Sequence, residues 1–571
     1  MTTLAAIAPN KNAIAARIGW AVLICATLYV CYFSHLGAIG FVGPDEPRYA
    51  WIARDMAESG DWVTPHLYGK PWFEKPPLYY WGAAICFKLF GVSEAAARLP
   101  SAVSALLATL AMAGLAWRIY GQETARWLLL LLPTTVGMIG FSHAAATDMP
   151  FSAMLTIAMV CAAVLLRLPL ECGGSPPLSP NEATAAKPTE APATARPSFI
   201  SFTSSTSFTS LLFGLFLALA VLAKGPAATI LCGGSVFFWA LLTKRWRDAL
   251  RLLHPAAIAA FCLTALPWYI LCARRNRDFF HIFIIEHNFK RYLTPEFQHV
   301  QPFWFYIPVL CIALLPWTLG SLILAKDLAR TWRESAWRNS PELFLICWAL
   351  VPVIFFSISK SKLPGYVLPA IPPMGLLVAC ALPSRVHKTL SGDRWIRITT
   401  GMTLIASGIL AFMQVEWISF GWVPVVLAAG GFAMLMLGVQ SGLASALLIG
   451  VATVVATVAL TFAGSTGQSL DQRLSARPSL GDAAMIWKDF SPDRSSTYKL
   501  QRSFQFSLTF YFHRELPDWS PNSRHGWVFS SRSEISDLRN RGLNCPVVFW
   551  YAVIVCEDPG SPANPLSSRQ P

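Results

Sequence analysis

Charged and aromatic residues gather between positions 43 and 76 of a chain that is otherwise strongly apolar. Residues 43–50 read Gly-Pro-Asp-Glu-Pro-Arg-Tyr-Ala, and residues 70–76 read Lys-Pro-Trp-Phe-Glu-Lys-Pro. Asp45 is a candidate for acid or base chemistry, and Lys75 can supply positive charge to a phosphate, while Glu74 can hold that lysine or bind a metal ion. The plainer interpretations are that Asp45 only caps a helix and that the second stretch is an interfacial aromatic belt with an extended lysine.

The residues that follow Asp45 predict a short helix. Asp45 suits its N-cap, Pro47 suits its first turn, and Gly60 suits its end. Arg48 and Ile52 then share one face of the helix. We expect an amphipathic helix that lies along a membrane surface.

Two further segments carry polar residues in apolar surroundings. Asp148 stands between two apolar runs, where an ionisable residue is costly and is therefore a functional candidate, unless it only caps a helix at the turn. His287 follows Glu286, and it can share a metal ion with Glu74, although a single histidine is more often structural. Arg291 can bind a phosphate through two parallel hydrogen bonds.

A last segment, residues 359–366, reads Ser-Lys-Ser-Lys-Leu-Pro-Gly-Tyr. Its lysines, Lys360 and Lys362, suit lipid phosphates at a membrane edge, and a solvated loop is the plainer interpretation.

Composition indicates the elements that must position these residues. Of the 571 residues, 54 % are hydrophobic and only 13 % are charged, against about 25 % in soluble domains. This excludes a soluble enzyme and a mainly disordered chain, and it predicts an all-α polytopic membrane protein. The net charge of +14 could indicate nucleic acid, but in a membrane protein it is first a topology signal, so we expect no nucleic-acid partner.

Thirteen apolar segments are long enough to be predicted as transmembrane helices, with a first domain over residues 1–463. They lie near 18–36, 97–117, 127–142, 149–166, 208–223, 227–243, 256–273, 303–325, 342–358, 364–382, 396–414, 421–438 and 442–463. With the N-terminus inside, the basic connectors at 244–247, 326–338 and 385–397 are cytoplasmic, as the positive-inside rule requires. The Pro-, Ala-, Ser- and Thr-rich stretch 168–207 is predicted to be a flexible cytoplasmic loop.

An odd number of spans places the tail, residues 464–571, outside, where its short β-prone runs predict a small α/β domain. Cys545 and Cys556 can form a disulfide there if that side is oxidising. The same topology places residues 37–96, 143–148 and 274–302 on the outer side. Acids, bases and cations that meet on one membrane face indicate chemistry on a lipid-linked substrate.

These segments, taken together, resemble a known family. The chain is similar to the aminoarabinose lipid A transferases (ArnT type) and the related protein mannosyltransferases of the GT-C glycosyltransferase fold. The matching segments are 44–50, 59–62, 73–76, 223–226, 266–268, 286–287, 302–304 and 362–368. They follow one another in order over most of the membrane part, and the tail matches much less clearly.

The resemblance implies transfer of a single sugar, such as 4-amino-4-deoxy-L-arabinose, from a polyprenyl-phosphate donor to lipid A or another cell-envelope acceptor. It further implies a bacterial inner membrane protein whose active site and tail are periplasmic. If the roles of the matching family positions apply to this chain, the catalytic acids are Asp45 and Asp148. The donor phosphate is expected to meet Arg48, Lys75, Arg291 and Lys362. The sugar pocket is expected to include Tyr49, Trp72 and Tyr366. Glu74 and His287 are candidate ligands of a divalent metal ion, either zinc or magnesium or manganese.

Two departures from the family pattern bear on these roles. Trp72 stands where a tyrosine is common, and the segment after His287 is one residue longer, so Lys290 is an alternative to Arg291. A protein O-mannosyltransferase of the same fold is the alternative enzyme. A lipid-linked sugar flippase is a weaker alternative. It predicts ionisable residues spread through the spans, and the predicted spans here are almost free of them.

Overall fold

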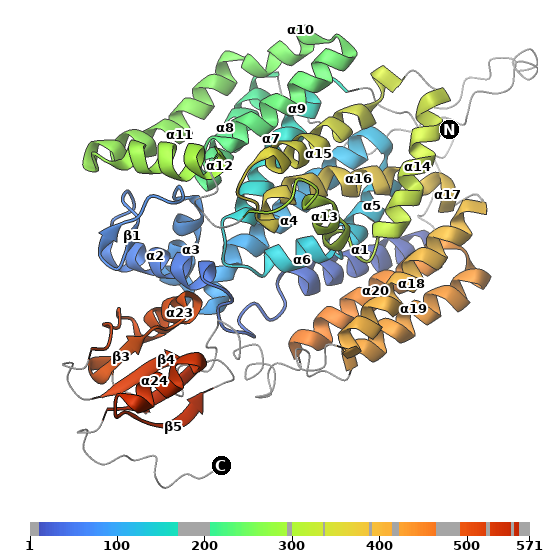
Figure 1. Ribbon diagram of the computed structural model, residues 1–571. Helices are drawn as coiled ribbons and strands as arrows, with labels where there is room; N and C mark the ends of the chain where they lie inside the picture. Colours follow the sequence, from blue (N-terminus) through green and yellow to red (C-terminus); the bar gives the residue numbers. More distant parts are fainter. Residues whose placement is uncertain are drawn as a thin grey trace, which may run out of the picture.

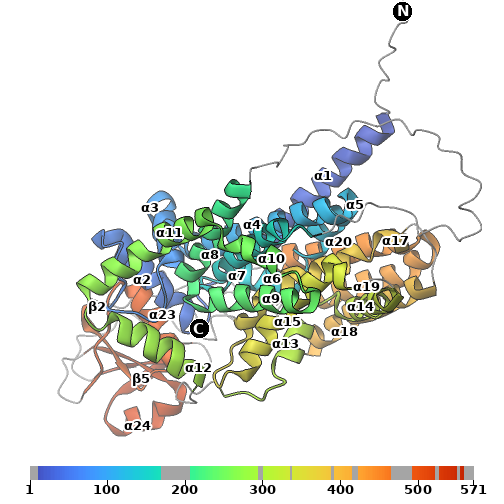
Figure 2. The ribbon, with the colours of Figure 1, turned by 90° about the horizontal axis from the view of Figure 1, so that it is seen from above.

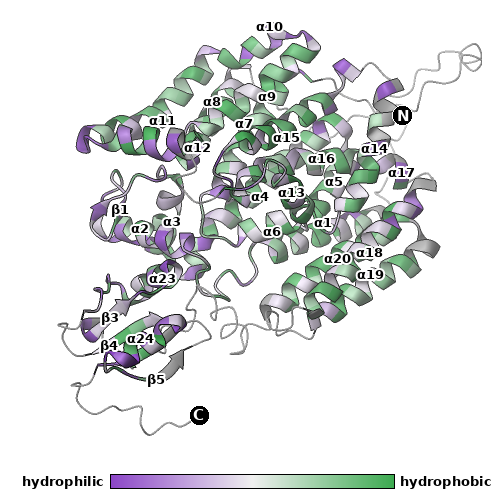
Figure 3. Cartoon of the chain, viewed as in Figure 1, coloured by the Kyte–Doolittle hydropathy of each residue, from purple (hydrophilic) through white to green (hydrophobic). Residues whose placement is uncertain are grey.

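The computed structural model describes residues 11–168, 206–293, 300–334, 337–386, 391–413, 422–463, 492–520, 526–549 and 553–558. The predicted loop 168–207 lies almost wholly outside the described residues. Figure 1 shows a large bundle of helices with a small domain of helices and strands at one end. The bundle helices are coloured mainly as hydrophobic in Figure 3, whereas polar residues concentrate around α2, α23 and the strands.

Eight helices of the described chain are long and apolar enough to cross a membrane. They are α1 (Lys11–Tyr32), α4 (Glu94–Tyr120), α7 (Asp148–Leu165), α8 (Thr206–Lys224), α11 (Pro255–Arg275), α15 (Pro341–Ile358), α18 (Ser391–Met413) and α20 (Leu443–Ala463). Ser93 caps α4 by accepting a hydrogen bond from the Ala96 N–H at 3.2 Å, which ends the preceding loop at a defined residue.

Two more predicted spans are bent pairs of helices. In the first, α5 (Gln122–Leu131) and α6 (Val136–Ser142) meet at 63°. In the second, α13 (Tyr306–Ala313) and the start of α14 (Thr318–Glu334) meet at 106°. The three remaining predicted spans coincide with α9 (Ala227–Thr243), with η4 (Pro364–Ala370) joined to α16 (Ile371–Cys380), and with α19 (Trp422–Ser441), whose apolar stretches are shorter. The count of crossings is therefore eight to ten by length and composition, and thirteen stays a prediction.

The first loop holds α2 (Asp45–Ser59), a two-stranded ribbon of β1 (His66–Leu67) and β2 (Lys70–Pro71), and α3 (Leu78–Phe90). Gly60 ends α2 with φ of 77°, a backbone conformation that glycine adopts without strain. The predicted cap at Asp45 is wrong. Pro44 precedes the helix without a side-chain cap, and Asp45 is the first helical residue.

The predicted surface position of α2 is also only partly right. Residues 46–50 are all buried, because α3 packs on one side of the helix and α23 (Arg502–Phe512) on another. Figure 1 and Figure 2 both place α23 beside α2.

Short helices complete the membrane part. They are α10 (Trp246–Ala249), η1 (Leu250–Leu253), the π-helix η2 (His281–Lys290), α12 (Arg291–Leu293), η3 (Trp337–Asn339) and α17 (Pro383–Val386).

The C-terminal part forms the small α/β domain that the sequence predicts. Its sheet has the order β3-β4-β6-β5, with β3 parallel to β4 and the other neighbours antiparallel. The strands are β3 (Ser495–Tyr498), β4 (Trp527–Ser531), β5 (Asn544–Phe549) and β6 (Val553–Glu557), accompanied by η6 (Pro492–Arg494), η7 (Arg532–Glu534) and α24 (Ile535–Asn540). Cys545 in β5 and Cys556 in β6 form the predicted disulfide.

Candidate active site

Arg48 is the centre of the predicted site in the first loop. Its Nη2 lies 2.5 Å from Oδ1 of Asp45, one turn back on α2, and 3.2 Å from Oε2 of Glu74. Only 9 % of the arginine side chain and 8 % of Glu74 are exposed, whereas half of Asp45 is exposed. Burial lowers the pKa of Arg48, but the charges of Glu74 and Asp45 raise it more, so the guanidinium stays charged.

Aromatic rings surround this guanidinium. Cζ of Arg48 lies 5.2 Å from the ring centre of Tyr49, 5.6 Å from that of Trp72 and 5.7 Å from that of Phe506. These rings stabilise the cation without occupying its N–H groups. Within the described chain, the buried Nε of Arg48 and the buried Nε1 of Trp72 have no hydrogen-bond partner. The cluster therefore has donors to offer a polar ligand.

Lys75 adds a second cation beside the same carboxylate. Its Nζ lies 3.8 Å from Oε1 of Glu74, and 11 % of its side chain is exposed. Glu74 therefore holds both Arg48 and Lys75, one by each oxygen. Arg48 and Lys75 thus both contact Glu74, a candidate metal ligand in the sequence, and Asp45 joins the cluster through Arg48.

Asp148 belongs to a second cluster, with a partner that the sequence argument missed. Nζ of Lys224, at the end of α8, lies 2.5 Å from Oδ1 of Asp148, at the start of α7. The same ammonium lies 4.5 Å from the ring centre of Tyr366. A Cβ on Gly365 would lie 2.4 Å from Oδ1 of Asp148, so only glycine lets the η4 backbone approach this carboxylate. The signal for Lys224 was present as a lysine in the last turn of an apolar helix.

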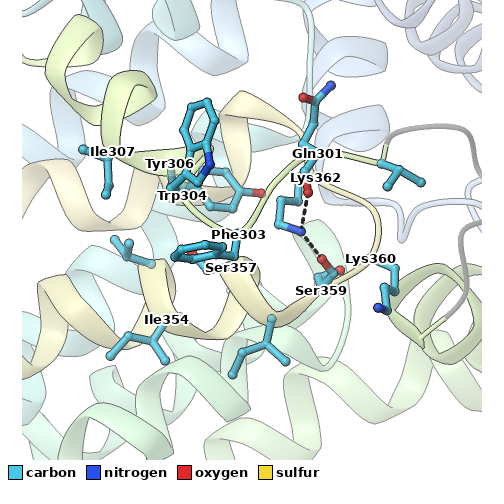
Figure 4. A pocket seen from close by; sticks show the side chains of 13 residues that line it. Gln301, Phe303, Trp304, Tyr306, Ile307, Ile354, Ser357, Ser359, Lys360 and Lys362 are labelled. Atoms are coloured by element: carbon cyan, nitrogen blue, oxygen red, sulfur yellow. Dashed lines mark hydrogen bonds between the residues drawn. The ribbon is translucent and has the colours of Figure 1, made fainter.

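Lys362 lies at the polar end of a cavity of about 600 Å³. Its Nζ donates hydrogen bonds to the carbonyl oxygens of Gln301, at 3.0 Å, and Ser359, at 2.5 Å. Burial and the neighbouring charge of Lys360 lower its pKa. Figure 4 shows the lysines at one end and apolar side chains at the other. The apolar lining includes Phe303, Trp304, Ile307, Val353, Ile354 and Ile358.

The predicted metal site does not fit the observed geometry. Among the described residues, no group of three or more histidine, cysteine, aspartate or glutamate side chains could hold a metal ion. Glu74 is engaged by two cations instead. His287 lies in η2, and the backbone of Arg291 begins α12, but the side chain of Arg291 lies outside the described residues. We derive no step through a metal.

Contacts join the three segments predicted to share the outer side. Oε1 of Glu46, on α2, accepts a hydrogen bond from the Ala145 N–H at 2.6 Å, which ties the first loop to the turn before α7. Arg275, at the end of α11, lies 2.9 Å from Asp61 in the first loop. The segments at 37–96, 143–148 and 274–302 therefore meet in space.

Comparison with known proteins shows which family the chain belongs to. Two family models described as dolichyl-phosphate-mannose-protein mannosyltransferase match residues 74–167 and 197–283. An undecaprenyl phosphate-α-4-amino-4-deoxy-L-arabinose arabinosyl transferase of Serratia proteamaculans is 32 % identical over 416 residues, which cover 70 % of this chain and 68 % of the relative. The chain belongs to this arabinosyl transferase family. A Yersinia enterocolitica relative of the same name is 32 % identical over 389 residues, which cover 68 % of this chain and 63 % of that protein, slightly under two thirds of its length.

A solved structure confirms the fold class that the sequence predicts for this chain. The crystal structure of ArnT from Cupriavidus metallidurans bound to undecaprenyl phosphate has a TM-score of 0.70 and 24 % identity, and the alignment covers 94 % of this chain and 98 % of that one. The apo structure of the same protein matches with the same TM-score. The protein is therefore a multi-pass membrane protein of the GT-C type with a small C-terminal α/β domain.

Proposed function

We propose that this protein is a membrane glycosyltransferase that moves 4-amino-4-deoxy-L-arabinose from undecaprenyl phosphate to lipid A or another cell-envelope acceptor. The observation that carries the proposal is Arg48, a charged guanidinium enclosed by rings and placed between the carboxylates of Asp45 and Glu74. The relatives from Yersinia and Serratia, whose names specify the undecaprenyl phosphate-aminoarabinose donor and arabinosyl transfer, support the donor part of the proposal.

The donor phosphate is assigned to the cations of the site. Breaking the bond between the sugar carbon and the phosphate oxygen leaves both bonding electrons on the leaving phosphate, so its negative charge grows in the transition state. Arg48 and Lys75 stabilise that charge from the first loop, and Lys362 and Arg291 are proposed to do so from the other side. Tyr49, Trp72 and Tyr366 are proposed to line the sugar pocket.

The acids are assigned to the sugar and the acceptor. The sugar carbon becomes positive as the phosphate leaves, and a carboxylate such as Asp148 or Asp45 stabilises it. An acceptor phosphate is already an anionic nucleophile, so Asp45 then mainly orients it. An acceptor hydroxyl must lose its proton as the new bond forms, and the half-exposed Asp45 can accept that proton.

The apolar cavity beside Lys362 suits the hydrocarbon chain of a lipid substrate. Phe303 and Ile358 are 78 % and 66 % exposed there, a position that suits contact with lipid. We further propose an inner membrane location, with residues 1–463 as the membrane domain and residues 464–571, together with the active site, on the periplasmic side.

The test is transfer by the purified protein in lipid vesicles that contain lipid A and the undecaprenyl-phosphate sugar. We expect wild-type protein to add one sugar, detected by mass spectrometry of lipid A, and Asp45→Asn to reduce the rate by about 100-fold to 10,000-fold. Asp55→Asn, on the same helix but next to His66 rather than Arg48, is the control and should stay active. Full activity of Asp45→Asn would overturn the site assignment.

A protein O-mannosyltransferase is the second candidate, because both family models carry that description. It predicts transfer of mannose from a polyprenyl phosphate to a serine or threonine peptide. Unmodified lipid A together with a mannosylated peptide would replace the first proposal with the second.

A further inference from the structure

Helix α23 of the C-terminal domain reaches the arginine at the centre of the candidate site. The ring centre of Phe506 lies 5.7 Å from Cζ of Arg48, which is 458 positions earlier in the chain. Phe506 is 7 % exposed, and its ring also lies 6.2 Å from that of Tyr68 in the ribbon of the first loop. The C-terminal domain therefore provides one of the three rings around the guanidinium.

Other contacts hold α23 against the first loop without Phe506. The Tyr511 hydroxyl donates a hydrogen bond to Oε1 of Glu94 at 2.6 Å and accepts one from the Phe41 N–H at 3.3 Å. His513 lies 2.8 Å from Glu58, at the other end of α2. A change at position 506 therefore tests the contact with Arg48 more than it tests docking of the domain.

The position of Arg48 is determined by few groups. Its two carboxylate contacts both involve Nη2, and in the described chain Nε has no partner. The ring of Phe506 limits where the guanidinium plane can lie, while it leaves the N–H groups available. Arg502, one turn before Phe506, lies 5.5 Å from the ring centre, so two guanidinium groups share one ring. Arg502 thus adds a third cation, beside Arg48 and Lys75, to a site that contains the carboxylates of Asp45 and Glu74, and such cations suit a phosphate.

We propose that Phe506 of the C-terminal domain is a positioning residue that holds Arg48 ready for the donor phosphate. The inference rests on the proposed function in assigning a phosphate to Arg48. It gives the C-terminal domain a role in donor binding, whereas a domain that only covers the acceptor would have none.

The test compares Phe506→Leu, which keeps apolar volume but loses the aromatic face, with Phe506→Trp, which keeps it. Full-length protein in detergent is titrated with undecaprenyl phosphate, and binding is measured by the shift in melting temperature. The same protein is then assayed for sugar transfer. We expect Phe506→Leu to weaken undecaprenyl phosphate binding and raise the donor KM by about tenfold, with kcat and the acceptor KM unchanged. Phe506→Trp should restore binding.

Two controls separate positioning from a structural effect. Phe512→Leu alters an aromatic residue of the same helix whose ring packs on Phe529, at 5.8 Å, inside the C-terminal domain. It should leave donor binding unchanged. In an Arg48→Lys background, Phe506→Leu should add little further loss, because the residue acts through the arginine.

Three results would overturn the inference. These are equal loss from Phe512→Leu, additive loss in the Arg48→Lys background, or a change confined to the acceptor KM. Wild-type protein that binds undecaprenyl phosphate but transfers no sugar would contradict the proposed function alone, because the binding arm still tests Phe506. Wild-type protein that does not bind undecaprenyl phosphate would contradict both.

Discussion

Two arginine–glutamate pairs meet at the first turn of α2, and they differ in how completely the arginine is hydrogen-bonded. Arg98, which is 1 % exposed, uses all five of its N–H donors. Two go to Glu46, at 3.1 and 2.8 Å, and three go to the carbonyl oxygens of residues 36, 39 and 40, at 2.7 to 2.9 Å. Arg48, two residues after Glu46, shares a single nitrogen between Asp45 and Glu74.

The difference indicates different roles for chemically identical side chains. Glu46 also accepts hydrogen bonds from the N–H groups of Val42 and Ala145, both at 2.6 Å, so the Arg98 pair joins three parts of the chain and has no donor left for a ligand. Arg48 has a buried N–H without a partner in the described chain and an exposed carboxylate beside it. A completely satisfied buried pair organises the fold, whereas an incompletely satisfied one is available for a substrate.

The largest effect should follow from breaking the structural pair. Arg98→Met leaves the carboxylate of Glu46 buried without a cation, which costs about 3–5 kcal/mol in comparable pairs. We expect a strongly lowered melting temperature and a low yield of folded protein, measured by thermal unfolding in detergent. A variant with wild-type melting temperature but no transfer activity would reverse the assignment of the two arginines.

A smaller effect, on activity, should follow at the second arginine. Arg48→Gln removes charged hydrogen bonds to the proposed phosphate, so we expect kcat/KM for the donor to fall by about 100-fold. The melting temperature should fall less than in Arg98→Met, because Lys75 still pairs with the buried carboxylate of Glu74. Arg54→Gln, on the same helix, loses an ion pair with the half-exposed Glu58 and a long hydrogen bond to the carbonyl oxygen of Phe510, at 3.4 Å, but no contact with Arg48 or Glu74, so it should stay active. Equal losses in the two variants would show that the helix, and not the site, is affected.

The ion pair of Lys224 and Asp148 is intermediate in burial between the Arg98–Glu46 pair and the Arg48–Asp45 pair. The exposed fractions of its side chains are 8 % for Lys224 and 21 % for Asp148. Lys224→Met leaves Asp148 without its cation and removes the ammonium beside Tyr366. We expect roughly a tenfold loss of kcat/KM together with a modest loss of thermal stability. Lys224→Arg keeps the charge and should recover part of both. Stability lost with activity retained would make this pair structural, like that of Arg98.

The smallest effect concerns docking of the C-terminal domain. Burial raises the pKa of Glu58, but Arg54 and His513 lower it more, so it lies below the ordinary value of 4.5. Its contribution is complete above pH 4.5 and is lost as the pH falls through the lowered pKa. Because the pair of His513 and Glu58 is half-exposed, we expect an effect below about 1 kcal/mol.

Protease cleavage between the domains should increase in acid for wild type, and Glu58→Gln should show that cleavage already at neutral pH. Identical pH profiles would exclude this contact from docking.

Local patterns predicted the helices well. Each of the thirteen apolar segments corresponds to a helix or a pair of helices, because apolar runs in lipid satisfy their backbone only within the helix. Local patterns failed where packing against distant elements determines whether a helix face is buried. The periodicity of α2 predicted a surface helix, but α3 and α23 cover it, and neither contact is encoded in α2 itself.

The candidate site was predicted in part. Asp45, Arg48, Glu74 and Lys75 were found from sequence because they lie within one loop, where unusual charge is visible locally. Lys224 lies within the matching segment 223–226, but the sequence indicates no role for it, because its partner, Asp148, is 76 residues away. Phe506 gave no signal at all, since a phenylalanine in an amphipathic helix indicates only a buried face.

The sequence by itself determined that this chain is a membrane protein, because apolar composition is a property of contiguous residues, and the resemblance of its short motifs to a known family implied the GT-C type. Only the tertiary structure decided which arginine is structural and which is available, because Arg48 and Arg98 differ in their neighbours and not in their local sequence. The same holds for Glu74, a suitable metal ligand by residue type that the folded chain places between two cations. Hydrogen-bond satisfaction and charge pairing depend on residues distant in sequence, and folding brings those residues together.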